Sequence, residues 1–133
     1  MSFSAVASGN IANVVVKTSG MEHSNTNDDI FMKICNENSA NCCETQLDQP
    51  NKNDFELGET DTFQPSHLNA CKNFKVTGSA PSVTMRLEGG DGWRGEYVKV
   101  SLLDGTLFTC PIFELIDDNG STVMLCSTDP SMS

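Results

Sequence analysis

Acidic side chains dominate the residues of this sequence that could do chemistry. Residues 22–61 hold ten Asp and Glu against two Lys, a balance of −8, in a chain whose formal net charge is −10. Carboxylates at this density repel one another unless water solvates them or a cation neutralises them. The residues alone leave both readings open, a solvated acidic face and a cation site. The same charge repels a phosphate backbone, so we expect no nucleic-acid partner.

Candidate catalytic groups are few. The two histidines are His23 and His67, and neither lies in a nucleophile motif such as Gly-x-Ser-x-Gly. The spacing from His67 to Cys71 does not match a Cys-x₂-Cys zinc set, and residues 88–92 carry two acids where a phosphate loop needs donors and a Lys. Spacing alone does not separate a glycosidase carboxylate pair from a cation cluster. We therefore expect no enzyme and no catalytic residue.

The cysteine content indicates an oxidising compartment. Six cysteines in 133 residues are enough for three disulfides, which are typical of secreted proteins. We predict one bridge between Cys110 and Cys126, across two late strands, and two bridges that join Cys35 and Cys71 to the adjacent pair Cys42 and Cys43. In a secreted protein the sequon Asn119-Gly120-Ser121 would lie on a surface turn.

The hydrophobic pattern is that of short strands. No segment of ten residues carries a 3.6-residue apolar period, whereas Ile30, Met32 and Ile34 alternate with polar positions. About eight strands, separated by Gly, Asn and Asp turns, predict a single all-β domain that folds as a sandwich. The expected strands are residues 14–16, 30–35, 59–63, 73–76, 83–87, 96–102, 106–110 and 122–126, with a further short strand at about 44–47.

Three ordered motifs resemble those of the PLAT domain, the lipoxygenase homology module. They are a polar run that leads into the strand at residues 30–34, then Leu47-Asp48-Gln49-Pro50, then Asn53-Asp54-Phe55-Glu56-Leu57-Gly58-Glu59-Thr60-Asp61-Thr62-Phe63. A Trp just before a strand, here Trp93, completes the pattern. The resemblance covers residues 13–126 and implies a β-sandwich of two four-stranded antiparallel sheets. We expect flexible tails at residues 1–12 and 127–133.

The resemblance also implies a calcium site in the loops. The matching metal ligands are Asn27, Asp28, Asn53, Asp54, Glu56 and Asp91. Their oxygens are the hard donors that Ca²⁺ prefers. In an extended segment, Asp54 and Glu56 would share one side while Phe55 faces the core. Trp93 and Phe63 are assigned to packing.

The implied function is that of a secreted, non-enzymatic, calcium-binding module that engages a protein or a lipid or membrane surface. Of the loop residues, only Met21 offers an apolar tip for membrane insertion, so deep insertion is not expected. Two alternatives stay open. One is a carrier of a small hydrophobic ligand, a lipid or pigment, held between the sheets or at an oligomer interface. The other is a structural domain with no ligand, and the oligomeric state is not indicated.

Overall fold

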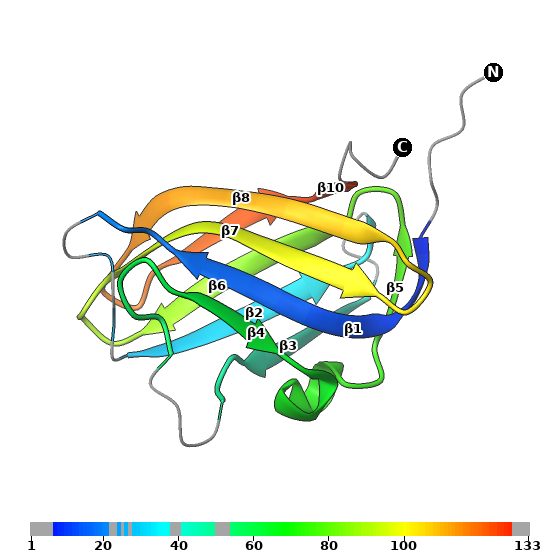
Figure 1. The fold of residues 1–133 in the computed structure, drawn as a ribbon, viewed down its shortest axis with the longest axis horizontal. Coiled ribbons are helices and arrows are strands. Elements are labelled where there is room, and N and C mark those ends of the chain that lie inside the picture. The colour runs from blue at the N-terminus through cyan, green and yellow to red at the C-terminus, as the bar shows by residue number, and fades with distance from the viewer. Residues whose placement is uncertain are drawn as a thin grey trace.

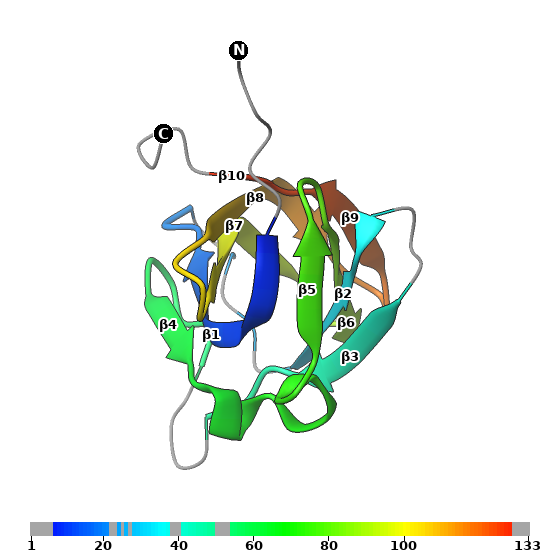
Figure 2. The same ribbon diagram turned by 90° about the vertical axis from the view of Figure 1, so that its right-hand side faces the viewer.

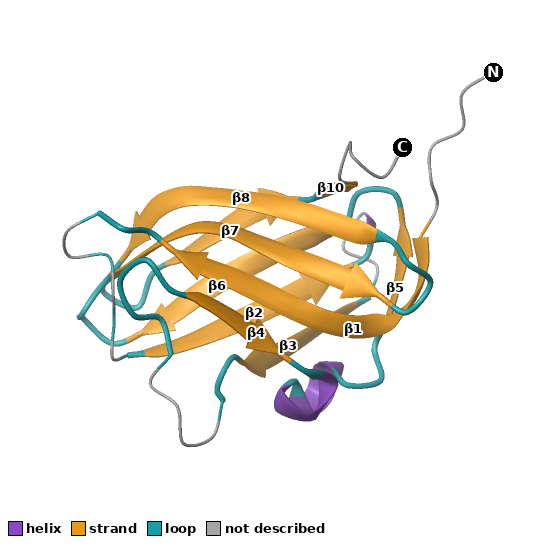
Figure 3. Cartoon of the chain, viewed as in Figure 1, coloured by secondary structure: helices purple, strands orange, loops and turns teal. Residues whose placement is uncertain are grey.

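The structure, a computed structural model, describes residues 7–21, 24, 26, 28–37, 41–49 and 54–128 (Figure 1). This part of the chain is built of strands, with two single-turn 3₁₀ helices between β4 and β5 (Figure 3). The elements are β1 (Ala7–Thr18), β2 (Asp29–Cys35), β3 (Cys42–Gln46), β4 (Thr60–Phe63), η2 (Pro65–His67), η3 (Asn69–Cys71), β5 (Lys75–Gly78), β6 (Ser82–Glu88), β7 (Trp93–Leu102), β8 (Leu107–Ile116), β9 (Ser121–Leu125) and β10 (Ser127–Thr128). Neither helix is long and apolar enough to cross a membrane.

Two antiparallel sheets face each other, and the predicted β-sandwich is confirmed (Figure 2). One sheet has the order β10-β8-β7-β1-β4, with β5 also paired to β1, and the other has the order β3-β2-β6-β9. The first sheet therefore has six strands where we expected four. The additional strands are short, because β5 pairs with the first four residues of β1 and β10 has two residues.

The domain extends further at both ends than the boundaries we expected at residues 13 and 126. β1 begins at Ala7, because Ala7–Asn10 pairs with β5 and Ile11, 1% exposed, belongs to the core. At the other end, the disulfide from Cys126 to Cys110 brings Ser127 beside Thr109, where β10 pairs with β8. These residues are strand and not tail.

β8 also runs past its predicted end at Cys110 and continues through Pro111 to Ile116. A proline interrupts a hydrogen-bonded ladder, and it is tolerated where the ladder is already broken. The register of β8 on β7 shifts between Gly95 and Tyr97, and Tyr97 opposes Pro111. The bulge therefore accommodates Pro111 within the strand.

The space between the sheets is filled by apolar side chains, among which aromatic rings are in contact. Phe55 stacks on Phe63 with ring centroids 5.9 Å apart and meets the edge of Trp93 at 5.6 Å. Trp93 and Phe63 are fully buried, which confirms their packing role. Trp93 Nε1 donates to Thr18 Oγ1 at 3.0 Å, so the buried indole N–H keeps a partner.

The predicted bridge between Cys110 and Cys126 is present, and Cys35 and Cys71 each pair with one member of the adjacent pair, as expected. Cys35–Cys42 closes the β2–β3 hairpin, Cys43–Cys71 ties β3 to η3, and Cys110–Cys126 joins β8 to the end of β9. They link segments 7, 28 and 16 residues apart in sequence. In a chain of 133 residues, such bridges restrict the unfolded state and stabilise a core of modest size.

Candidate functional site

Three loops meet at the end of the sandwich where β1 ends and β7 begins. The β1–β2 loop contributes Thr26 N, which donates to Phe55 O at 3.3 Å, and Ser24 O, which accepts from Arg94 N at 3.0 Å. Gly58 N donates to Ser19 O at 3.1 Å. Segments far apart in sequence are thus held together by backbone hydrogen bonds, and we call this region the loop end.

Asp28 and Asp91, two of the predicted metal ligands, are joined at the loop end. Asp91 N donates to Asp28 Oδ2 at 2.6 Å, and Asp91 Oδ2 accepts from Thr26 Oγ1 at 3.1 Å. Thr26, 1% exposed, in turn accepts from Asp28 N at 3.0 Å through its hydroxyl oxygen. A buried hydroxyl therefore connects two carboxylate-bearing residues that lie 63 positions apart in sequence.

Gly89 makes the approach of Asp28 possible. Its φ is +131°, and a Cβ at this position would lie 2.3 Å from Asp28 Cγ. A side chain there would displace the Asp28 carboxylate, and an L residue rarely adopts this backbone conformation. The missing side chain of Gly89 thus sets where the Asp28 carboxylate lies.

The Asp54 segment does not have the extended geometry that we expected. Phe55 has a φ of +63°, in the left-handed region, and Glu59 N donates to Glu56 O at 3.0 Å to close a turn. Fully buried Asp61 accepts from Phe55 N at 2.9 Å, which stabilises this unusual backbone. The extended segment on which the expected shared side of Asp54 and Glu56 depended is therefore not formed, although Phe55 does lie in the core, 3% exposed.

The predicted ligands are therefore only partly united. Asp28 contacts Asp91, while Asp54 is 8% exposed and its Oδ2 accepts from Gln49 N at 2.8 Å. Asn27 and Asn53 lie outside the described residues. Among the residues that the structure describes, no three His, Cys, Asp or Glu side chains form a group that could hold a metal ion. The donor chemistry fits Ca²⁺, but the described hydrogen bonds join two of the predicted carboxylate ligands, Asp28 and Asp91, and not a full set.

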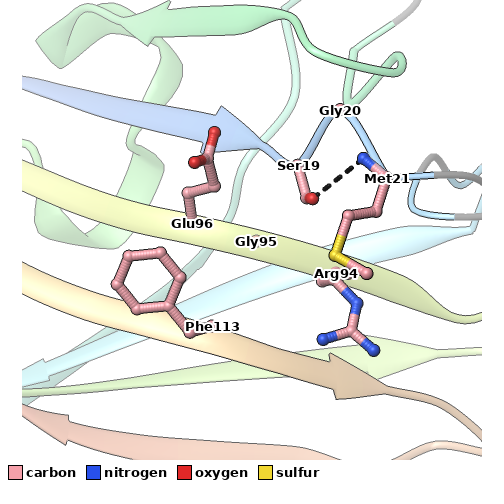
Figure 4. Close-up of a pocket in the computed structure, with 7 residues that line it drawn as sticks. All are labelled: Ser19, Gly20, Met21, Arg94, Gly95, Glu96 and Phe113. Atoms are coloured by element: carbon pink, nitrogen blue, oxygen red, sulfur yellow. Dashed lines mark hydrogen bonds between the residues drawn. The ribbon is translucent and has the colours of Figure 1, made fainter.

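A groove beside the loop end contains residues that the sequence did not predict. It has a volume of about 570 Å³ and is lined by Ser19, Gly20, Met21, Arg94, Gly95, Glu96 and Phe113. Figure 4 shows Phe113 and Glu96 toward one end of the groove, and Met21 and Arg94 toward the other. Met21 is 60% exposed and Phe113 65%.

Phe113 was missed because we ended its strand at Cys110. Its φ is +48°, which is rare for a bulky residue, and it lies within the bulged part of β8. The run Pro111-Ile112-Phe113 was the available signal, since a proline followed by two large apolar residues is compatible with a bulged edge.

Comparison with known proteins identifies the family. The family model described as Embryo-specific protein 3 (ATS3) matches residues 4–112. The chain belongs to the ATS3 family. No curated protein matches this ATS3-family chain.

Solved structures place the ATS3-family chain in the PLAT-like, C2-like fold. Coral 8R-lipoxygenase, described as calcium-activated through a C2-like domain, aligns with a TM-score of 0.66 at 20% identity over 87% of this chain and 17% of its own. Alpha-toxin from an avian strain of Clostridium perfringens aligns with a TM-score of 0.65 at 23% identity, over 93% and 33% respectively. Alpha toxin from Clostridium absonum gives 0.67 at 25%, over 88% and 31%. The chain spans a third or less of these proteins, so the likeness shows the fold, and the predicted PLAT resemblance is confirmed at that level.

Proposed function

We propose that this ATS3-family domain is a secreted, non-enzymatic module that binds a lipid or membrane surface in the presence of Ca²⁺. The observation that carries the proposal is the hydrogen-bonded link between Asp28 and Asp91, made directly by Asp91 N and indirectly through Thr26, which places two carboxylate-bearing residues at one end of the sandwich. The calcium activation described for coral 8R-lipoxygenase through its C2-like domain supports the same role for this fold. Three disulfides support an extracellular setting.

Asp28 and Asp91 would hold the ion, together with oxygens of the predicted ligands Asp54, Glu56, Asn27 and Asn53. Bound Ca²⁺ supplies positive charge to a chain with a net charge of −10 and accepts further oxygen ligands from a surface. Without that charge, an anionic lipid surface would repel the protein. Calcium dependence of surface binding follows from this electrostatic balance.

The groove would provide the apolar part of the contact. Met21 and Phe113 expose side chains of the kind that enter the boundary between headgroups and acyl chains. Arg94, which lies in the same groove, adds a cation for a headgroup phosphate. Shallow contact is expected, because two apolar side chains bury little area.

The test is thermal unfolding with EDTA, with Ca²⁺ or with Mg²⁺, followed by sedimentation with vesicles that contain phosphatidylserine. A dissociation constant of roughly 10⁻⁴–10⁻³ M and about 2 mM Ca²⁺ would stabilise the fold by about 0.6–1.8 kcal/mol. For a chain of this length the midpoint would rise by about 2–7 °C. The double variant Asp28→Asn and Asp91→Asn should lose both the rise and the vesicle binding.

Asp104→Asn is the matched control. Asp104 is also a carboxylate that accepts backbone hydrogen bonds, from Ser8 N at 3.1 Å and Thr106 N at 2.9 Å, but it lies in the β7–β8 turn, away from the loop end. This variant should keep the Ca²⁺ response. Equal responses of wild type and the double variant would contradict the calcium site, and no response in any protein would favour a structural domain without a ligand.

A second candidate function, the carrier of a small hydrophobic ligand, is favoured by the groove. Its volume of about 570 Å³ lies within the range of small-molecule sites, roughly 300–1,000 Å³. The predicted position between the sheets is less suitable, because side chains such as Phe63, Trp93 and Phe108 fill that space. An organic extract of protein purified from its source, analysed by mass spectrometry, should contain a stoichiometric lipid or pigment if the carrier function is correct.

A further inference from the structure

The turn between β8 and β9 carries the one N-glycosylation sequon of the chain. The sequence has twelve asparagines, and only Asn119 is followed by a residue other than proline and then by Ser or Thr. The motif is Asn119-Gly120-Ser121. A sequon is an acceptor only if the folded protein leaves its side chain in solvent, so the local structure decides whether a glycan could remain there.

The fold presents Asn119 at the tip of a turn. Gly120 N donates to Asp117 O at 2.8 Å, and Asp118 and Asn119 have φ values of +48° and +59°. Asp117, Asp118, Asn119 and Ser121 are all exposed. Asn and Asp adopt this left-handed conformation more readily than other residues, so the turn is compatible with its sequence. A sugar at Asn119 would extend into water.

The hydrogen bonds of Asn119 orient its carboxamide. Asn119 N donates to Gly89 O at 2.9 Å, and Gly89 N donates to Asn119 Oδ1 at 2.8 Å. Because only the oxygen of a carboxamide can accept a bond from an N–H group, Oδ1 faces Gly89 and Nδ2 takes the other position on the planar group. A substituent on Nδ2 leaves the carbonyl oxygen in place, so glycosylation preserves the contact with Gly89.

We propose that Asn119 is an N-glycan attachment site. The donor class is an oligosaccharide linked to a polyprenyl diphosphate. In the transfer, a bond forms between Asn119 Nδ2 and C1 of the first sugar, the bond between C1 and the diphosphate oxygen breaks, Nδ2 loses one proton, and the lipid diphosphate leaves. The site needs passage through a secretory compartment, which the three disulfides support, and it does not depend on the calcium proposal.

The experiment is secretory expression of the full chain behind a cleavable leader in eukaryotic cells, followed by intact mass measurement. The wild-type protein should carry the mass of one N-glycan, and a peptide N-glycosidase should remove it and convert Asn119 to Asp. Ser121→Ala should lose the glycan while it keeps Asn119 and its hydrogen bonds. Ser121→Thr should keep the glycan.

Ser121→Ala also controls for spontaneous deamidation of Asn119-Gly120, since this variant retains the Asn-Gly pair and lacks the acceptor motif. The proposal is supported if the peptide N-glycosidase converts Asn119 to Asp in the wild-type protein and causes no such conversion in Ser121→Ala. If wild type and Ser121→Thr are both secreted with the mass of the bare polypeptide and three disulfides, the proposal is overturned.

Discussion

Substitution of Gly89 by Ala tests whether the contact between residues 89 and 28 builds the loop end. The new Cβ would lie 2.3 Å from Asp28 Cγ, so the carboxylate must move and its bond from Asp91 N is lost. A hydrogen bond to a charged group is worth about 1.5–3 kcal/mol, and we take about 1.5 kcal/mol because Asp28 is partly exposed. The positive φ of residue 89 adds backbone strain of about 1–3 kcal/mol.

Gly105→Ala is the matched control for the strain. Gly105 has a φ of +95°, and no atom lies within 4 Å of a Cβ built there. This variant should therefore show the strain alone, about 1–3 kcal/mol. The two variants should differ by about 1.5 kcal/mol, which corresponds to about 6 °C in the unfolding midpoint.

Urea unfolding followed by fluorescence is the assay, since Trp93 is the one tryptophan of the chain and is fully buried. Gly89→Ala should also lose the Ca²⁺-induced rise in the midpoint, whereas Gly105→Ala should keep it. If the free energies of unfolding of the two variants agree within about 0.5 kcal/mol, the Asp28 contact contributes nothing and the reasoning is refuted.

Two further predictions concern the disulfides and acid stability. Replacing both Cys43 and Cys71 by Ser should lower the free energy of unfolding by about 3.6 kcal/mol, and replacing both Cys35 and Cys42 should lower it by about 2.4 kcal/mol, because the first bridge spans 28 residues and the second 7. Equal losses of free energy in urea unfolding would contradict this ranking. The pKa of Glu37 lies below its ordinary value of 4.5, because its carboxylate accepts bonds from the hydroxyl of Ser79 and from the N–H groups of Ser79 and Ala80. Its stabilisation is present above pH 4.5 and is lost as the pH falls through the lowered pKa, so Glu37→Gln should show a smaller drop in unfolding midpoint on acidification than wild type.

The family-level architecture was readable from the sequence because its determinants are local. Alternation at Ile30, Met32 and Ile34 sets which face of β2 is buried, and all three side chains are 1% exposed or less. Turn residues such as Asp118-Asn119-Gly120 separate the strands as expected. The sequence predicted the bridge from Cys110 to Cys126, but the structure chose which of Cys42 and Cys43 pairs with Cys35 and which with Cys71, because a bridge needs chain segments that the fold brings together.

The ends of elements were less accessible to prediction because distant partners decide them. β1 begins at Ala7 because β5, more than sixty residues later, pairs with it. β8 continues through Pro111 because a shift in its register on β7 accommodates the ring. Neither partner is visible in a local window of sequence.

The sequence by itself determined an acidic, disulfide-bonded β-sandwich and the types of oxygen donor in its loops. Only the tertiary structure decided which partners these donors have: Asp28 and Asp91 are joined directly and through Thr26, whereas Asp54 accepts from Gln49 N. Residue type and spacing report local conformation, but convergence depends on loop geometry, and here that geometry rests on the left-handed backbone of Phe55 and the missing side chain of Gly89.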